Sequence, residues 1–302
     1  MQKVIMQAAC YIAVILLGYL LKKTGIFKQS DFHVLSKLTL NVTLPAAVIC
    51  NLAGKDLDFT LLLIPLMGVG MGVFYCLAGM VISIGKDKKQ RAFDVQNITA
   101  YNIGNFTLPF AQGFLGPLGL LTVSLFDIGN SMMGLGGGYG IAAAVQDGKK
   151  FSFRRIFSAL SHSIPFITNI IMLTLAIAHI RLPDFVLDLA GMVAKANPFN
   201  AMFMIGVGFH LTGDRSQIST LVRILGTRCC ISLATALVCY FLLPFPIECR
   251  QALVLLMLSP VSSAHPVFTA ELQNDVGLSS ALNSMSILIS LVLMIGATLL
   301  IL

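Results

Sequence analysis

The chain has 302 residues, of which 57% are hydrophobic and only 11% are charged, and its mean hydropathy is +0.88. Soluble domains carry about 25% charged residues, so this composition excludes an ordinary soluble protein and predicts an integral membrane protein. The net charge of +7 does not indicate nucleic-acid binding, because the basic residues stand in short stretches between apolar runs and leave no basic face.

Ten apolar runs of membrane-spanning length follow one another along the chain. The first five are predicted at residues 4–21, 32–52, 61–84, 92–115 and 118–145. The second five are predicted at residues 156–180, 185–211, 221–242, 252–272 and 278–302. The predicted fold is therefore all-α and integral to the membrane, with a first five-helix repeat at 1–145, a cytoplasmic joint at 146–155 and a second repeat at 156–302.

The fourth and ninth runs are not composed like plain membrane helices. The fourth contains Gly104 and Pro109, which both weaken a helix, with Asn102 and Asn105 at bilayer depth. A similar stretch, residues 259–266, follows in the ninth run about 157 residues later. Non-helical chain at that depth is tolerated only where it is buried in protein or lines a cavity. Two interrupted helices in corresponding places of two halves indicate the binding site of a secondary transporter.

Five spans on each side of the joint require the two halves to enter the membrane from opposite sides, as in an inverted repeat. Similar residues recur in the two halves at nearly one spacing: Pro45 and Pro198 lie 153 residues apart, and Pro109 and Pro266 lie 157 apart. The segment 127–131 also resembles residues 283–286 at a similar spacing. The sequence thus predicts two inverted repeats with the interrupted spans 4 and 9 in corresponding places.

Basic residues predict the orientation in a cell (inner) membrane. The odd-numbered connections hold fourteen, against four in the even-numbered connections and the termini, so we expect odd connections in the cytoplasm and both termini outside. The fourteen are Lys22, Lys23, Lys28, Lys86, Lys88, Lys89, Arg91, Lys149, Lys150, Arg154, Arg155, Arg215, Arg223 and Arg228.

Several stretches together resemble the auxin efflux carrier family, which includes plant PIN exporters and bacterial permeases of organic acids. They are NVTLPA at 41–46, NIGNFTLP at 102–109, FDIGN at 126–130, VFTAE at 267–271 and LSSALNS at 278–284. The resemblance covers both halves. Members usually place an asparagine near the ninth-span break, where this chain has Ser262, Ser263 and His265, and the joint is short. The first departure speaks against a plant-like auxin specificity, and the short joint favours the bacterial permease branch, only distantly like the plant exporters.

The resemblance implies a ten-helix fold like that of sodium/proton antiporters and bile-acid transporters, in which the interrupted spans 4 and 9 cross at their breaks. Spans 3–5 and 8–10 would form a core that moves like an elevator against a scaffold of spans 1, 2, 6 and 7, and the scaffold is a possible homodimer interface. The implied substrate is a small organic anion such as malonate, malate or an auxin-like acid.

The two prolines suggest how such an anion is held. Proline suits the first turn of a helix, so Pro109 and Pro266 are each expected to open a new half-helix, with Thr107 capping the first and His265 or Ser263 the second. Helix amino ends facing one cavity attract an anion. Asn102 and Asn105 either donate to the carboxylate or only satisfy the broken backbone. The predicted substrate-binding residues are Asn102, Asn105, Thr107, Pro109, Ser262, Ser263, His265 and Pro266.

Asp127 is the main candidate for ion or proton coupling, because a carboxylate in mid-membrane tends to face the interior and to be functional. It would carry a proton, bind sodium with Asn130, or serve only as a structural hydrogen-bonded acid. Asn283 and Glu271 are further coupling candidates, although Glu271 also suits an interfacial position. The residues leave open proton coupling, sodium coupling or uniport, and import or export.

The function predicted from these features is a secondary or facilitative organic-anion transporter. The alternative is a sodium-coupled symporter of the bile-acid type, with an oxygen cage from Asp127, Asn130, Ser262, Ser263 and Glu271. The chain lacks the common hydrolase, zinc-protease and nucleotide-binding motifs, so we expect no enzyme. The expected partners are the anion and membrane lipids, without nucleic acid and with no cofactor apart from Na⁺ or H⁺ as the coupling ion.

Overall fold

The computed structural model describes residues 2–55, 58–148, 152–209 and 217–302. In this part of the chain every regular element is helical, and the one β-bridge pairs Tyr101 with Val261. The prediction of an all-α protein is therefore confirmed. Residues 149–151 of the predicted joint and residues 210–211 at the end of the predicted seventh span lie outside the described residues.

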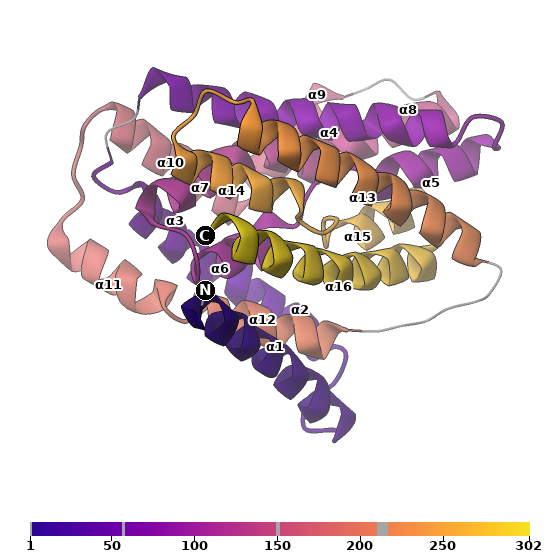
Figure 1. The fold of residues 1–302 in the computed structure, drawn as a ribbon. Coiled ribbons are helices and arrows are strands. Elements are labelled where there is room, and N and C mark those ends of the chain that lie inside the picture. The colour runs from indigo at the N-terminus through magenta and orange to yellow at the C-terminus, as the bar shows by residue number, and fades with distance from the viewer. Residues whose placement is uncertain (1, 56–57, 149–151, 210–216) are drawn as a thin grey trace.

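The first half contains α1 to α8 (Figure 1). Its elements are α1 (Gln2–Lys23), α2 (Asp31–Leu38), η1 (Thr39–Thr43), α3 (Leu44–Leu52), η2 (Phe59–Leu62), α4 (Leu63–Ile82), α5 (Lys88–Ile98), η3 (Ile103–Thr107), α6 (Leu108–Ala111), α7 (Pro117–Met132), η4 (Met133–Gly137) and α8 (Gly138–Asp147). Segments η1, η3 and η4 are π-helical turns: η1 joins α2 to α3, η4 joins α7 to α8 across a kink at Gly136, and η3 leads directly into α6 but is separated from the end of α5 by residues 99–102.

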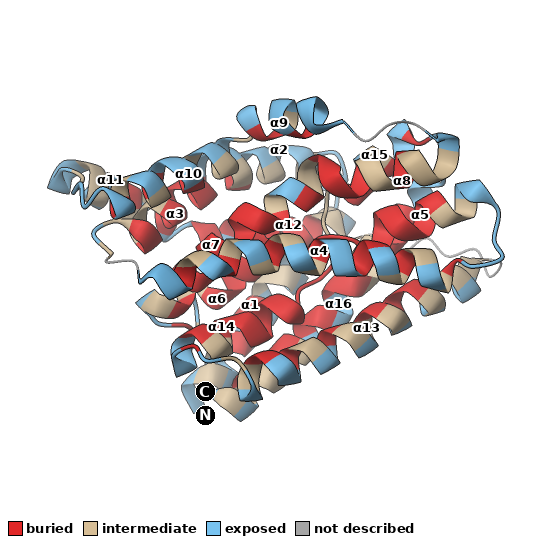
Figure 2. Ribbon diagram, turned by 90° about the horizontal axis from the view of Figure 1, so that it is seen from above, coloured by how far each residue is buried: buried red, intermediate tan, exposed pale blue. Residues whose placement is uncertain are grey.

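The second half contains α9 to α16. Its elements are α9 (Phe153–Ser161), α10 (Ile164–Ile177), α11 (Asp184–Ala194), α12 (Asn197–Gly208), α13 (Ile218–Phe241), α14 (Ile247–Met257), α15 (His265–Glu271) and α16 (Val276–Ile301). The start of α1 and the end of α16 lie close together in both views (Figures 1 and 2).

Six helices among the described residues are long and apolar enough to cross a membrane, or seven if the bent pair α9–α10 counts as one. The six are Gln2–Lys23, Asp31–Leu52, Phe59–Ile82, Pro117–Asp147, Ile218–Phe241 and Val276–Ile301. The other four predicted spans are each divided into shorter helices. Two of these divisions, in 92–115 and 252–272, were predicted, whereas the 84° bend between α9 and α10 and the break between α11 and α12 were not.

The exterior of the helix assembly is apolar, while the buried residues gather along its centre (Figure 2). Large apolar side chains on the outer helices are exposed, among them Leu66 (65%), Leu237 (59%) and Val292 (71%). A soluble protein rarely exposes contiguous apolar surface on this scale. Together with the six long apolar helices, this surface supports a multi-pass membrane protein.

The helices make two sets of close contacts, which are joined by contacts of α7 with α3 and α10 and of α6 with α12. In one, α1 packs against α12, and α3 packs against α10 and α11. In the other, α4 packs against α5 and α7, α14 against α7 and α13, and α15 against α16. The α4–α7 contact depends on glycine: a Cβ atom at Gly129 would lie 1.8 Å from the carbonyl oxygen of Pro65, so only glycine permits this approach. That contact fixes the position of α7 along α4, and α7 carries Asp127 and Asn130.

Candidate functional site

The two interrupted segments lie side by side at the centre of the molecule, as their sequences predict. One runs from the end of α5 at Ile98 to the start of η3 at Ile103, and the other from the end of α14 at Met257 to the start of α15. Tyr101 and Val261 pair as an antiparallel bridge. The Asn102 N–H donates to the carbonyl of Pro260 over 2.9 Å. The two non-helical segments thereby satisfy part of each other's buried backbone. We refer to this paired region as the crossing.

Each side of the crossing is fastened by an asparagine from the next long helix of its own half. Asn130 on α7 accepts from the Tyr101 N–H over 2.8 Å and donates to the Tyr101 carbonyl over 3.0 Å. Asn283 on α16 donates to the Val261 carbonyl over 3.0 Å, while Ser286 accepts from the Val261 N–H over 3.2 Å. In both interrupted segments, therefore, an asparagine side chain binds the backbone of the residue that forms the β-bridge. The predicted ion-coupling residues Asn130 and Asn283 both have this structural role.

A buried arginine on α13 also joins the two segments, and the sequence analysis misplaced it. Arg228 was counted in a cytoplasmic loop, but α13 begins at Ile218, so the side chain lies inside the helix and is only 4% exposed. It donates to the carbonyls of Ile98, Ala100 (3.1 Å), Ser259 (3.4 Å) and Pro260 (3.4 Å). The sequence signal that could have found it is the presence of an arginine inside an apolar run, because such a residue tends to face the interior and to be functional.

Aromatic rings enclose the same guanidinium. Its central carbon lies 4.6 Å from the ring centroid of Tyr75 and 4.8 Å from that of Tyr101, which are cation–π distances. Tyr75 is itself held by a 2.9 Å hydrogen bond to Ser232, one turn after Arg228 on α13. Arg228 is therefore fixed between α4, α13 and the crossing.

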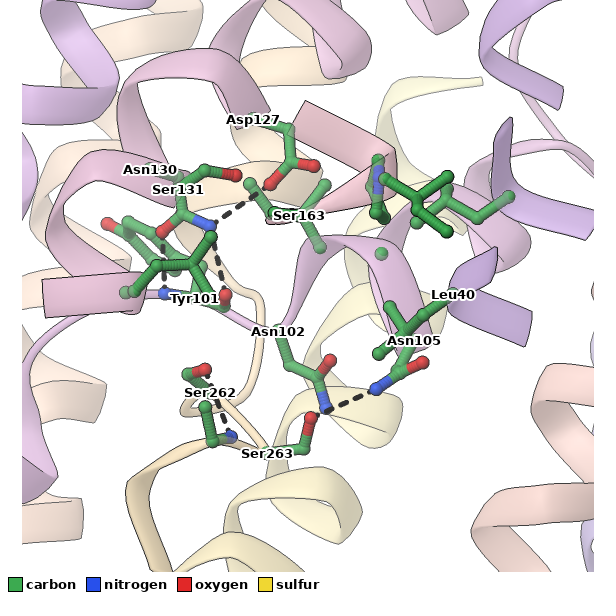
Figure 3. Close-up of a pocket in the computed structure, with 18 of the residues that line it drawn as sticks. Leu40, Tyr101, Asn102, Asn105, Asp127, Asn130, Ser131, Ser163, Ser262 and Ser263 are labelled. Atoms are coloured by element: carbon green, nitrogen blue, oxygen red, sulfur yellow. Dashed lines mark hydrogen bonds between the residues drawn. The ribbon is translucent and has the colours of Figure 1, made fainter. Parts of the chain in front are cut away.

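Two cavities flank the crossing, and they share three polar residues. The first has a volume of about 330 Å³ and the second of about 270 Å³. Asn102, Asn105 and Ser263 line both. Asn105 donates to the Ser263 hydroxyl over 3.0 Å, so these two side chains connect the interrupted segments (Figure 3). Among the described residues, the side-chain amide of Asn102 makes no hydrogen bond, which leaves it free for a ligand.

The first cavity gathers further predicted polar groups from both halves of the chain. Asp127, Asn130 and Ser262 line it, and Asn130 donates to the Asp127 carboxylate over 3.2 Å (Figure 3). Asp127 is only 8% exposed. Residues from outside the crossing complete the lining, among them Asn41 and His162, to which the sequence analysis gave no binding role.

The second cavity is more apolar. Of the predicted site residues, Pro266 and Asn283 line it, together with Ser284. The remaining wall includes apolar side chains from α2, α12 and the segment that follows α12: Phe32, Met204, Ile205 and Phe209. A carboxylate at Asn102 would thus have room for an apolar substituent on this side.

Three predicted binding residues line neither cavity. Thr107 is fully buried and bonds the Ser259 hydroxyl at 2.6 Å. The carbonyl of Pro109 accepts from the Tyr11 hydroxyl over 3.1 Å. His265 is also buried, at 1% exposure. The chain breaks set which residues are near the crossing, but the helical rotation after each break turns these three side chains away from both cavities.

The predicted helix caps are wrong. Thr107 has helical backbone angles, and its hydroxyl donates back to the Asn102 carbonyl over 3.2 Å, because the helix begins earlier, at Ile103. In the second half Ala264 occupies the cap position of α15, and the Ser262 hydroxyl accepts from its N–H over 3.3 Å. Pro266 does lie in the first turn of α15, as predicted.

Glu271 lies at the end of α15, away from both cavities. It is exposed and forms an ion pair with Arg155, whose guanidinium carbon lies 4.0 Å from the ring centroid of Tyr139. The structure therefore places Glu271 in a surface contact between α9 and α15 rather than with the other predicted coupling residues.

No family model matches the chain. The chain is 26% identical over 129 residues to a protein of Methanothermobacter thermautotrophicus described as an uncharacterized transporter. The match spans 40% of this chain and 42% of that protein, so less than half of either is aligned. The resemblance to the auxin efflux carrier family stays a prediction.

Proposed function

We propose that this chain is a secondary membrane transporter of a small organic anion, such as malonate, malate or an auxin-like carboxylate. The apolar helical fold and the similarity to an archaeal transporter fit a membrane transporter. The observation that carries the proposal is the placement of Asn102, Asn105 and Ser263 between two cavities at the crossing. We propose no enzymatic reaction at this site.

The chemistry of the crossing favours an anion over a cation. The free Asn102 amide supplies two N–H donors for a carboxylate. The helical run that begins at Ile103 directs its unpaired backbone N–H groups toward the crossing, and a helix amino end carries about half a positive charge. The buried Arg228 offsets the negative carbonyl groups of both interrupted segments close by. These three contributions act together on a ligand carboxylate.

Asp127 is the proposed coupling group. Its carboxylate lines the cavity that also exposes Asn102, so a bound substrate anion and an ionised Asp127 would share one cavity. Two unit charges about 6 Å apart repel by about 3 kcal/mol at an effective dielectric constant of about 20. Binding of the anion and binding of a proton to Asp127 are thus thermodynamically coupled, which would make the two move together.

The two packing groups correspond to the proposed scaffold and core. The scaffold would comprise α1–α3 and α9–α12, and the core α4–α8 and α13–α16. The first cavity is bordered by residues 162–165, which follow the joint predicted to be cytoplasmic. The second is bordered by residues from 29–33 and by 208–209, which lie next to the first and seventh connections, also predicted to be cytoplasmic. The conformation is accordingly proposed to be inward-facing. At the opposite end, core and scaffold are joined by hydrogen bonds such as Asn197 to Gln112 (2.8 Å).

A sodium-coupled symporter of the bile-acid type is the second candidate. One observation favours it: Asp127, Asn130, Ser262 and Ser263 line one cavity and offer several oxygen atoms to a cation. Glu271, which the predicted cage also included, lies elsewhere. Uptake by proteoliposomes with and without a sodium gradient separates the two candidates, because only the symporter requires sodium.

The deciding experiment measures thermal stabilisation of the purified protein by a panel of carboxylates, followed by counterflow in proteoliposomes. Asn102→Ala is expected to lose stabilisation, and Asp127→Asn is expected to bind but to lose proton dependence of transport. Thr174→Ala is the matched control, because Thr174 is exposed on α10 and bonds only the carbonyl one turn earlier. Absence of any response in the wild type, or an unchanged response in Asn102→Ala, contradicts the proposed site.

A further inference from the structure

We infer that Arg228 sets the charge selectivity of the crossing, by neutralising the carbonyl ends of α5 and α14 so that the site favours an anion over a neutral ligand of the same shape. The inference rests on the proposed function and deepens it. It assigns Arg228 as a positioning and specificity-determining residue that does not itself line either flanking cavity.

The two helices that end at the crossing present their carbonyl ends to one side chain. The last carbonyls of a helix lack intrahelical partners and together carry about half a negative charge. On the α5 side Arg228 donates to Ile98, the last residue of the helix, and to Ala100 two residues later. On the α14 side it donates to Ser259 and Pro260, which directly follow the end of that helix at Met257 and its cap Leu258. One guanidinium thus lies where the carbonyl ends of two helices converge. Its planar set of five donors suits this arrangement better than an ammonium would.

The charge of Arg228 is not balanced by an acid. Within the described part of the chain no carboxylate pairs with it, although it is 4% exposed. Its neighbour on α13, Arg223, differs in this respect, since it forms a 2.7 Å ion pair with Asp94. The positive charge of Arg228 is about equal to the two half charges of the helix ends. The site then retains the positive contribution of the helix that begins at Ile103.

Loss of that balance has a defined consequence. With a neutral side chain at 228, the ends of α5 and α14 would oppose the amino end at Ile103, and the crossing would no longer prefer negative charge. A carboxylate should then lose about tenfold or more in affinity relative to its primary amide, which corresponds to about 1.4 kcal/mol. A purely structural arginine would instead affect both ligands alike.

The test compares each acid with its neutral amide, malonate with malonamide and indole-3-acetate with indole-3-acetamide, by titration calorimetry on purified protein. Arg228→Gln keeps two donors without the charge, and Arg228→Lys keeps the charge without the planar donor set. We expect the acid-to-amide affinity ratio to fall about tenfold in Arg228→Gln and to stay near the wild-type value in Arg228→Lys. Melting temperatures report separately on folding.

A second route to the same charge change leaves Arg228 in place. Ser232→Asp sets a carboxylate one turn from Arg228 on α13 and is expected to lower the ratio as Arg228→Gln does. An unchanged ratio in either folded neutralising variant overturns the inference. If neither neutralising variant folds, Arg228→Lys decides. A fall in its acid-to-amide affinity ratio, although the positive charge is retained, also overturns the inference. A wild type that binds no acid refutes the proposed function itself, and the inference with it, whereas acid binding with a charge-independent ratio refutes only the role of Arg228.

Discussion

Replacing Asn130 by alanine tests how the crossing is held together. The Asn130 side chain satisfies both the N–H and the carbonyl of Tyr101, at 2.8 and 3.0 Å, and Tyr101 is buried. An unsatisfied buried polar group costs about 1–3 kcal/mol. Two such groups in Asn130→Ala therefore predict a loss of about 3 kcal/mol after partial relaxation. At about 2 °C per kcal/mol for a chain of this size, the melting temperature should fall by about 6 °C.

Asn283→Ala is the matched comparison from the other half. Asn283 satisfies only the carbonyl of Val261, since the Val261 N–H bonds to Ser286, so the expected fall is about half as large. The assay is thermal unfolding of the purified protein in detergent, followed by intrinsic tyrosine fluorescence or by loss of the monodisperse peak. A fall of less than about 1 °C in Asn130→Ala, or a larger fall in Asn283→Ala, would refute the assignment of these asparagines as backbone clamps.

Three further predictions concern the surrounding packing. Gly129→Ala should prevent the close α4–α7 contact and abolish stable expression, because the new Cβ atom would lie 1.8 Å from a carbonyl oxygen, whereas Gly70→Ala, with no atom within 4 Å, should express like the wild type. Gln112→Ala should open the contact with Asn197 and raise hydrogen–deuterium exchange in α6; unchanged exchange would contradict a closing role. Glu271→Gln should change melting by less than about 2 °C, because its ion pair is exposed, and a large loss would show that Glu271 has a buried role instead.

Part of the site could be predicted from composition at bilayer depth. Asn102, Gly104 and Pro109 interrupt an apolar run, and any chain with those residues there must pair its backbone or line a cavity. The same argument finds Asp127, because a carboxylate in an apolar run must face the interior. It applies equally to Arg228, which lies inside the predicted span 221–242 but was counted with the basic residues of a cytoplasmic connection.

Composition alone could not predict the direction in which each side chain faces around its helix axis. Thr107 and His265 stand beside the breaks in sequence, yet their side chains face away from both cavities. Glu271 follows the second break by a few residues, but α15 carries it to the surface, where Arg155 is its partner. A shift of a single residue in the start of a helix turns every following side chain by about 100°.

The sequence alone determined the class of the protein, the apolar runs and the two places where helices break, because each of these follows from which residues stand next to one another. Only the tertiary structure decided that the breaks pair through Tyr101 and Val261, that Asn130 and Asn283 clamp them, and that one arginine joins both. Those contacts link residues about 20 to 160 positions apart. They depend on how whole helices pack, which local composition does not specify.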